Sequence, residues 1–346
     1  MIVYFLICII ALLLAHISSK INRFTLLFVA IILLTIVSGF RDYSVGTDTH
    51  TYHYVFNHYT SNMEYTYGQE RGFLEISRIV VSIFRNDRAM FVTCSFITNF
   101  MIIAFLWKLR NQYSLTLMFF FYITLFYPDT MNIMRQYLGA SIVFYYTYLL
   151  KKRKYIIHIL IITICGIIFH RSIFIAVSIT ILWYVLYDRS DYRKIKVFVL
   201  TLLSLPFILN PIINTFDEYS WYFVDGSLSL GIMIILNICV YLIYCCIYST
   251  RVKNKLDFNE ICIDKFLIYT YGISLLFNLI GCYYDQMGRI GLCFSLFKIP
   301  LYARMCSNNK YRQFFIVVNV ILALYYIIVR VVINGECGVF PYSMNI

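Results

Sequence analysis

Three short segments of the sequence combine arginine with residues that bind anions or transfer protons. They are NIMRQ with Asn132, Arg135 and Gln136, FHRS with His170, Arg171 and Ser172, and YYDQMGR with Asp285, Gln286 and Arg289. Guanidinium groups match phosphate oxygens in paired hydrogen bonds. Each segment lies at the end of an apolar stretch, where ionisable groups are costly and are functional candidates. The alternative is that they join helices by pairing with one another, and Asp285 and Arg289 have a suitable i,i+4 spacing.

A fourth polar segment, residues 41–88, is the longest of the segments that we predict to lie on the outer side of a membrane. Its candidate site residues are Arg41, Asp48, Tyr52, Glu70 and Arg71, within the sequences RDYSVGTDTHTYHYVF and GQERGF. Asp48 and Tyr52 share a face if residues 48–56 are helical. Gly46 and Gly72 can supply tight backbone turns beside a ligand. Long loops held by a rigid scaffold often carry function.

The amino-acid composition indicates whether the chain folds in water or in a lipid bilayer. Of 346 residues, 61% are hydrophobic and only 13% are charged, whereas soluble domains carry about 25% charged residues. A soluble core could not bury so much apolar side chain, and a disordered chain is excluded for the same reason. We therefore predict an all-α, polytopic integral membrane protein that forms a single domain over residues 1–346.

A transmembrane helix needs about 20 apolar residues, and the chain contains about twelve stretches of suitable composition. The predicted spans are 2–19, 24–40, 89–107, 114–128, 137–150, 155–169, 172–187, 196–214, 228–249, 265–284, 289–303 and 312–333. Pro206 and Pro211 should bend the span in which they lie.

Residues 72–84 are apolar but too short for an ordinary span. At helical spacing Phe73, Ile76, Val80 and Phe84 form one stripe, and Glu75 and Arg78 lie on the other side. This pattern predicts an interfacial or re-entrant helix.

The distribution of charge favours one topology. If residues 72–84 do not cross, every lysine except Lys298, which lies within a span, falls on one side of the membrane. The positive-inside rule makes that side cytoplasmic and places both termini in the periplasm. The cations left outside are all arginines: Arg41, Arg71, Arg78, Arg85, Arg88, Arg135, Arg171, Arg289 and Arg330. Any one of these arginines can pair with an acidic residue on the outer side or extend to lipid headgroups. Lysine would serve these purposes equally well, so a set made of arginine alone favours a more specific role.

These outer groups predict a ligand with an anionic part near the membrane interface and a polar part in water. A lipid-linked pyrophosphate sugar and an ordinary phospholipid headgroup both fit this description.

At these residues the sequence resembles the EpsG/Wzy family of bacterial polysaccharide repeat-unit polymerases. The resemblance is carried by RDYSVGTDTHTYHYVF, ERGF, NIMRQYLGASIVF and FHRSIFIAV in order, with support from MGRIGLCF and FPY. It implies an inner-membrane glycosyltransferase that moves a glycan from undecaprenyl pyrophosphate onto a new lipid-linked repeat unit at the periplasmic face. The matched positions are Arg41, Gly46, Asp48, Tyr52, Glu70, Gly72, Arg135, Gln136, His170, Ser172 and Arg289. Arg171 occupies a variable position within the FHxS motif.

Glycosyl transfer requires a base for the acceptor hydroxyl and a stabilised leaving group. We assign Arg135 and Arg289 to the pyrophosphate with Arg41 as a third cation, and place Tyr52 and Gln136 in the same substrate site. The base is His170, Asp48 or Glu70, and the sequence leaves these alternatives open. Because arginine can stabilise the pyrophosphate, no metal or other cofactor is expected, and His50, His53 and His58 lack a recognised zinc spacing.

Two other functions use the same lipid-linked substrate. A ligase would move the glycan to a different acceptor, and a flippase would carry the intact lipid-linked oligosaccharide across the membrane. A flippase should line a central cavity with polar groups, whereas the inner halves of these spans hold few ionisable residues. The resemblance further implies a chain-length regulator and a flippase as partners. No nucleic-acid-binding motif is present.

Overall fold

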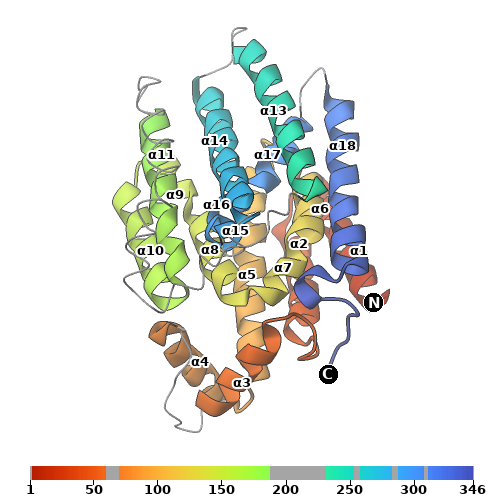
Figure 1. Ribbon diagram of the computed structural model, residues 1–346, viewed down its shortest axis with the longest axis vertical. Coiled ribbons are helices and arrows are strands. Elements are labelled where there is room, and N and C mark those ends of the chain that lie inside the picture. The colour runs from red at the N-terminus through yellow and green to blue at the C-terminus, as the bar shows by residue number, and fades with distance from the viewer. Residues whose placement is uncertain are drawn as a thin grey trace. The chain divides into compact units, whose positions relative to one another are not determined.

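The computed structural model describes residues 2–59, 70–187, 231–252, 258–282, 287–307 and 311–345. Within these ranges the regular elements are all helices (Figure 1). In addition, one isolated antiparallel bridge pairs Arg41 with Met344. The predicted all-α fold is therefore confirmed for the part of the chain that is described. The contacts group into two compact units: Met1–Tyr146 with Thr163–Ile173 and Tyr302–Ile346, and Thr147–Ile162 with Phe174–Leu301. This division passes through three helices, Tyr155–Ile168, Arg171–Ala176 and Lys298–Met305, and a single membrane domain stays a prediction.

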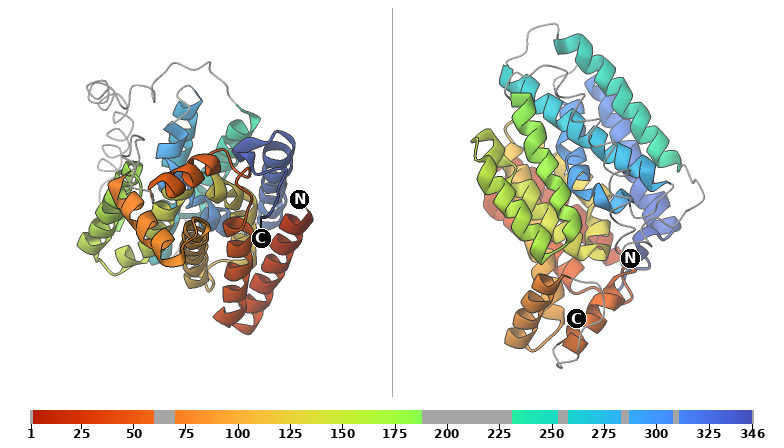
Figure 2. Two further views of the ribbon diagram at one scale, coloured as in Figure 1. Left: turned by 90° about the horizontal axis from the view of Figure 1, so that it is seen from below. Right: turned by 60° about the vertical axis from the view of Figure 1, so that its left-hand side comes forward.

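The first unit is built on four helices, each of which packs on the next in sequence order. They are α1 (Ile2–Ile21), α2 (Phe24–Gly39), α5 (Arg88–Leu109) and α8 (Met134–Tyr146). Helix α1 packs on α2, α2 on α5, and α5 on α8, and the left view of Figure 2 shows α1 and α2 side by side. The contact between α2 and α5 is close, since a Cβ on Gly39 would lie 2.9 Å from the Val92 backbone. Small residues permit such an approach between membrane helices.

Helix α1 shows why these sequences form membrane helices. Its buried face carries Cys8, Ala11 and Ala15, whereas Leu6 and Leu13 on the opposite face are exposed. In water the exposed face would be unstable, but in a bilayer it contacts lipid. Four helices of the described chain are long and apolar enough to cross: Ile2–Ile21, Arg88–Leu109, Cys262–Gly281 and Arg312–Ile333. The protein is thus a membrane protein, while the number of spans and the sidedness of the termini stay predictions.

Several predicted spans are interrupted. Span 114–128 corresponds to α6 (Leu115–Leu125) followed by the short α7 (Tyr127–Asn132), and the helix changes direction at Phe126. Pro128 lies in the first turn of α7, where it lacks an amide to continue α6. Span 137–150 is likewise divided between α8 and α9 (Tyr148–Lys151).

The second unit and the C-terminal part complete the architecture. The second unit contains α9, η1 in part (Arg171–Ala176), α11 (Val177–Tyr187), α13 (Ile232–Val252), α14 (Phe258–Gly281), α15 (Met287–Ile290), α16 (Leu292–Ser295) and α17 in part (Lys298–Met305). Helix α10 (Tyr155–Ile168) contributes to both units, and α18 (Arg312–Tyr325), η3 (Tyr326–Ile333) and η4 (Glu336–Gly338) belong to the first. Predicted span 289–303 is thus three short helices. Predicted span 196–214, with Pro206 and Pro211, lies outside the described residues.

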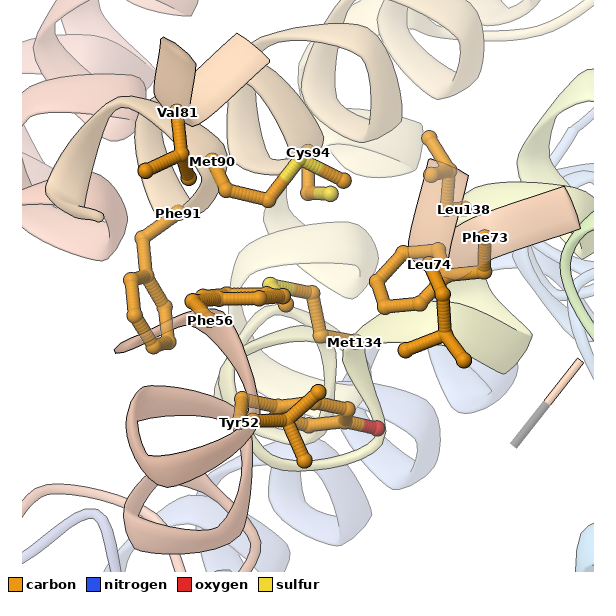
Figure 3. Close-up of a cluster of buried hydrophobic side chains, with 11 residues drawn as sticks. Tyr52, Phe56, Phe73, Leu74, Val81, Met90, Phe91, Cys94, Met134 and Leu138 are labelled. Carbon is orange, nitrogen blue, oxygen red and sulfur yellow. The ribbon is translucent and has the colours of Figure 1, made fainter. Parts of the chain in front are cut away.

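Helices α3 (Thr49–Tyr59) and α4 (Arg71–Phe84) lie at the end of the first unit where α5 begins (Figures 1 and 2). They enclose a hydrophobic cluster with α5 and α8, formed by Tyr52, Val55, Phe56, Phe73, Leu74, Val81, Met90, Phe91, Cys94, Met134 and Leu138 (Figure 3). This cluster fixes the two elements that carry Tyr52 and Glu70.

Residues 72–84 form a helix as predicted, and its apolar residues differ in burial. Phe73 is buried, and Glu75 and Arg78 are exposed as expected. Phe84, however, is 65% exposed, because the buried side of α4 follows Leu74 and Val81. The interfacial position of α4 stays a prediction.

Gly72 allows α4 to approach the end of α10. A Cβ at this position would lie 2.9 Å from the Ile168 Cα, so Gly72→Val should push α4 away and destabilise the protein by about 1–3 kcal/mol. Thermal unfolding of the purified protein in detergent measures the effect. Gly231→Val is the control, because nothing lies within 4 Å of that position. Equal melting temperatures for the two variants would contradict the proposed close contact.

Candidate functional site

Glu70 and Arg135 form the central ion pair of the site. Arg135 Nη1 donates to Glu70 Oε2 at 2.7 Å, and the two side chains are only 14% and 10% exposed. Glu70 immediately precedes α4, and Arg135 lies in the first turn of α8. The backbone N–H of Arg171 donates to the other oxygen, Glu70 Oε1, at 2.9 Å. Segments ERGF, NIMRQ and FHRS, which are far apart in the sequence, therefore meet at one carboxylate.

Tyr52 brings α3 to the same pair. The Arg135 guanidinium carbon lies 5.9 Å from the centre of the Tyr52 ring and 5.7 Å from that of Phe73. Such contacts stabilise a cation that has lost part of its hydration. Burial raises the pKa of Tyr52, so its hydroxyl stays protonated and can donate a hydrogen bond near neutral pH. Residues 49–56 are helical, as part of α3, which begins directly after Asp48, so the condition under which Asp48 and Tyr52 would share a face is met for this segment.

His170 is engaged through both ring nitrogens. Its Nδ1 accepts the Ser172 backbone N–H at 3.2 Å and lies 2.8 Å from Ser172 Oγ. Its Nε2 lies 3.0 Å from Nε2 of the Gln136 amide. Gln136 Oε1 is buried and has no hydrogen-bond partner among the described residues, and rotating the amide by 180° would let Oε1 accept the Nε2–H of His170. In this arrangement His170 holds Gln136 and the turn at Ser172.

Arg41 lies in a different network and is 1% exposed. It donates to the carbonyls of Ser38 and of Met131, the latter at 2.8 Å, and lies 3.4 Å from Thr49 Oγ1. Its guanidinium is also 5.0 Å from the Phe91 ring centre.

The two carbonyls that bind Arg41 belong to the last turns of α2 and α7. Helix C-termini carry negative partial charge, which offsets the cost of burying a cation. Burial lowers the pKa of Arg41 to about 10, so the side chain is still charged at neutral pH. In this structure Arg41 joins helix ends, and its assignment to pyrophosphate stays a prediction.

Asp48 is positioned by the same region. Asn132 Oδ1 accepts both the Asp48 backbone N–H at 2.9 Å and the Thr47 hydroxyl at 2.8 Å. Gly46 has φ +94°, and a Cβ there would lie 2.7 Å from Thr49 Oγ1, so the turn requires glycine. The Gly46 N–H donates to the Gly338 carbonyl at 2.7 Å. The C-terminal segment therefore supports the loop that carries Asp48.

Two further polar clusters were absent from the sequence predictions. In one, the Asp129 carboxylate accepts from Tyr326 Oη at 3.0 Å and Tyr137 Oη at 3.3 Å, and Cys337 Sγ donates at 2.8 Å. Burial raises the pKa of Asp129. The signal in the sequence was an acid directly after Pro128 at the end of an apolar stretch, which indicates a specific partner.

In the other cluster, His53 Nδ1 lies 2.5 Å from Asp87 Oδ2, and Tyr43 Oη donates to the same carboxylate at 3.0 Å. The rings of Tyr43 and His53 stack with centres 3.7 Å apart. This contact fastens α3 to the beginning of α5. No sequence spacing identifies it, because residues 43, 53 and 87 meet only after α3 has packed.

Arg289 lies on α15 in the second unit and is partly buried. Its neighbours Asp285 and Gln286 are outside the described residues. Of the residues predicted for the site, the structure thus brings together Glu70, Arg135, Gln136, His170 and Tyr52. It places Arg41 and Asp48 in a supporting network of the same unit, and Arg289 stays a prediction.

Comparison with known proteins identifies one family. The family model described as EpsG matches residues 24–344, which confirms the resemblance found in the sequence motifs. No curated protein and no solved structure matches the chain.

The role of Arg41 in joining helix ends predicts a large effect on stability. Arg41→Lys keeps the charge but loses the planar group that reaches several acceptors at once, and it should destabilise the protein by about 2–3 kcal/mol. Thermal unfolding in detergent measures the loss, and Arg78→Lys on the exposed side of α4 is the matched control. A melting temperature like that of the control would show that Arg41 is not a structural clamp.

Proposed function

We propose that this chain, which belongs to the EpsG family, is a polymerase of O-antigen or exopolysaccharide repeat units. Membership supports a polysaccharide polymerase in general. In the specific reaction that we propose, a glycan leaves undecaprenyl pyrophosphate and joins a sugar hydroxyl of a new lipid-linked repeat unit. The contact that best supports this proposal is the Glu70–Arg135 pair, because it unites three of the motifs that carry the resemblance.

The chemistry of the cluster suits this reaction. The bond between the anomeric carbon and the pyrophosphate oxygen breaks, and the electron pair leaves with the pyrophosphate. A guanidinium such as that of Arg135 stabilises this charge most strongly where water is scarce, and only 14% of its side chain is exposed. The acceptor oxygen forms the new bond to the anomeric carbon and gives its proton to a base. Asp48, Glu70 and His170 are the proposed candidates, with Tyr52 and Gln136 placed to hold the substrate.

The location of the enzyme is part of the proposal. The lysine-rich loops favour a bacterial cytoplasmic membrane protein with its site facing the periplasm and both termini on that side. Arg289 would supply a second cation for the pyrophosphate, and Arg41 a third. A flippase that delivers the repeat unit and a chain-length regulator are the expected protein partners.

Two alternatives use the same substrate but give different products. A ligase-type glycosyltransferase performs the same bond exchange with a different acceptor, and a flippase moves the lipid-linked oligosaccharide without breaking a bond. Purified protein supplied with the lipid-linked repeat unit distinguishes them. A ladder of chain lengths supports the polymerase. Transfer to a foreign acceptor alone would favour a ligase, and transport of intact single repeats across vesicles would favour a flippase.

Arg135→Ala tests the residue assignment. Removing a cation that stabilises the leaving group should lower polymer formation about 100-fold or more, measured as the rate at which the ladder appears. Arg78→Ala, an exposed arginine on α4, is the control and should keep the wild-type rate. Because the substitution leaves Glu70 unpaired, the protein level and melting temperature are measured alongside. A folded Arg135→Ala protein that makes polymer at the wild-type rate would remove Arg135 from the mechanism.

A further inference from the structure

We infer that Glu70 is a counter-ion that the donor pyrophosphate displaces from Arg135, and that the displaced carboxylate is the base for the acceptor hydroxyl. This inference rests on the proposed function and selects one of its three candidate bases. The observations that support it are the contacts of the two carboxylate oxygens of Glu70 and of the two ring nitrogens of His170.

The Glu70–Arg135 ion pair is suited to exchange because the carboxylate and the pyrophosphate both fit the Arg135 guanidinium. A guanidinium binds a carboxylate and a phosphate through the same arrangement of N–H groups. Glu70 Oε2 accepts a hydrogen bond from Arg135 Nη1 at 2.7 Å. A pyrophosphate carries more negative charge than one carboxylate, so it competes effectively for a cation that is held near the aromatic rings of Tyr52 and Phe73.

Displacement would not release Glu70 from the site. Its second oxygen, Oε1, accepts the Arg171 backbone N–H at 2.9 Å, and that hydrogen bond does not depend on Arg135. Glu70 also directly precedes α4, whose first turns are buried through Phe73 and Leu74. The carboxylate can therefore turn away from Arg135 while remaining beside the bound pyrophosphate. Its Oε2 lone pair, occupied before, is then available for a proton.

His170 is better suited to positioning than to proton transfer. Its Nδ1 faces the backbone N–H and hydroxyl of Ser172, and its Nε2 faces the amide of Gln136. The Ser172 contact shapes the turn that presents the Arg171 N–H to Glu70. His170 thus acts through Glu70, and a base role would require it to break one of these contacts.

The proposed step transfers the glycan and one proton. The acceptor oxygen bonds to the anomeric carbon as its proton moves to Glu70 Oε2, and the pyrophosphate oxygen leaves with its electron pair beside Arg135. When the lipid pyrophosphate departs, Glu70 releases the proton to water and pairs with Arg135 again. Because the base becomes available only after the pyrophosphate has bound, the donor should bind before the acceptor.

Glu70→Gln separates binding from turnover. The purified full-length protein is tested with farnesyl pyrophosphate as a soluble probe for binding, and with the lipid-linked repeat unit for turnover. Loss of the competing carboxylate should tighten binding about fivefold or more, while kcat falls about 100-fold. Glu75→Gln, an exposed glutamate on the same helix, should change neither value. Unchanged or weaker binding in folded Glu70→Gln, or wild-type turnover, overturns the inference.

Glu70→Asp guards against misfolding, because it keeps the charge opposite Arg135. Its shorter side chain should weaken the pair and misplace the base, so kcat falls about tenfold or more while binding of farnesyl pyrophosphate is at least as tight as in the wild type. Weaker binding in this variant would also contradict the exchange.

His170→Asn tests the positioning role through the pH profile of kcat. If Glu70 is the base, the variant is slower but keeps the acidic limb of the profile, and Glu70→Gln loses that limb. The opposite pattern would make His170 the base and overturn the inference. Failure of the proposed function looks different, since wild-type protein would then build no ladder from the lipid-linked repeat unit, whether or not it binds farnesyl pyrophosphate.

Discussion

The arrangement of the first unit depends on one buried cation. The Arg41 guanidinium contacts carbonyls at the ends of α2 and α7 and the hydroxyl of Thr49 at the start of α3. Without this cation two helix ends would point carbonyl groups at each other in a region that water does not reach, which is costly. The position of α7 in turn affects two parts of the site. Asn132, at the end of α7, holds the loop that carries Asp48. Helix α8, which carries Arg135, begins shortly after α7.

The site itself combines a rigid support with an ion pair that can exchange its anion. The hydrophobic cluster under α3 and α4 fixes Tyr52 and Glu70 (Figure 3), and His170 fixes Gln136 and the turn at Ser172. Arg135 lies between these parts and already holds an anion. Sites that bind pyrophosphate need concentrated positive charge, and a counter-ion within the protein makes such charge tolerable when the ligand is absent.

Each difference between prediction and structure has a specific physical cause. Spans 114–128 and 137–150 were predicted as continuous because hydropathy does not register an interruption of the helix, which here lies at Phe126 and at Thr147. On α4 the apolar residues surround more than half of the helix, so periodicity could not tell which ones face α3 and α5. Asp129 was missed because two of its three donors, Tyr326 and Cys337, are distant in the sequence.

The sequence by itself determined the membrane class, the all-helical fold, the family, and the residues at which chemistry is possible. These follow from composition, apolar length and motif order, which require no knowledge of distant contacts. Only the tertiary structure decided which of those residues meet. It paired Glu70 with Arg135, separated Arg41 from them, and occupied both nitrogens of His170. The physical reason is that a buried charge takes whichever partner the packing of helices brings within hydrogen-bond distance, and that packing is not local in the sequence.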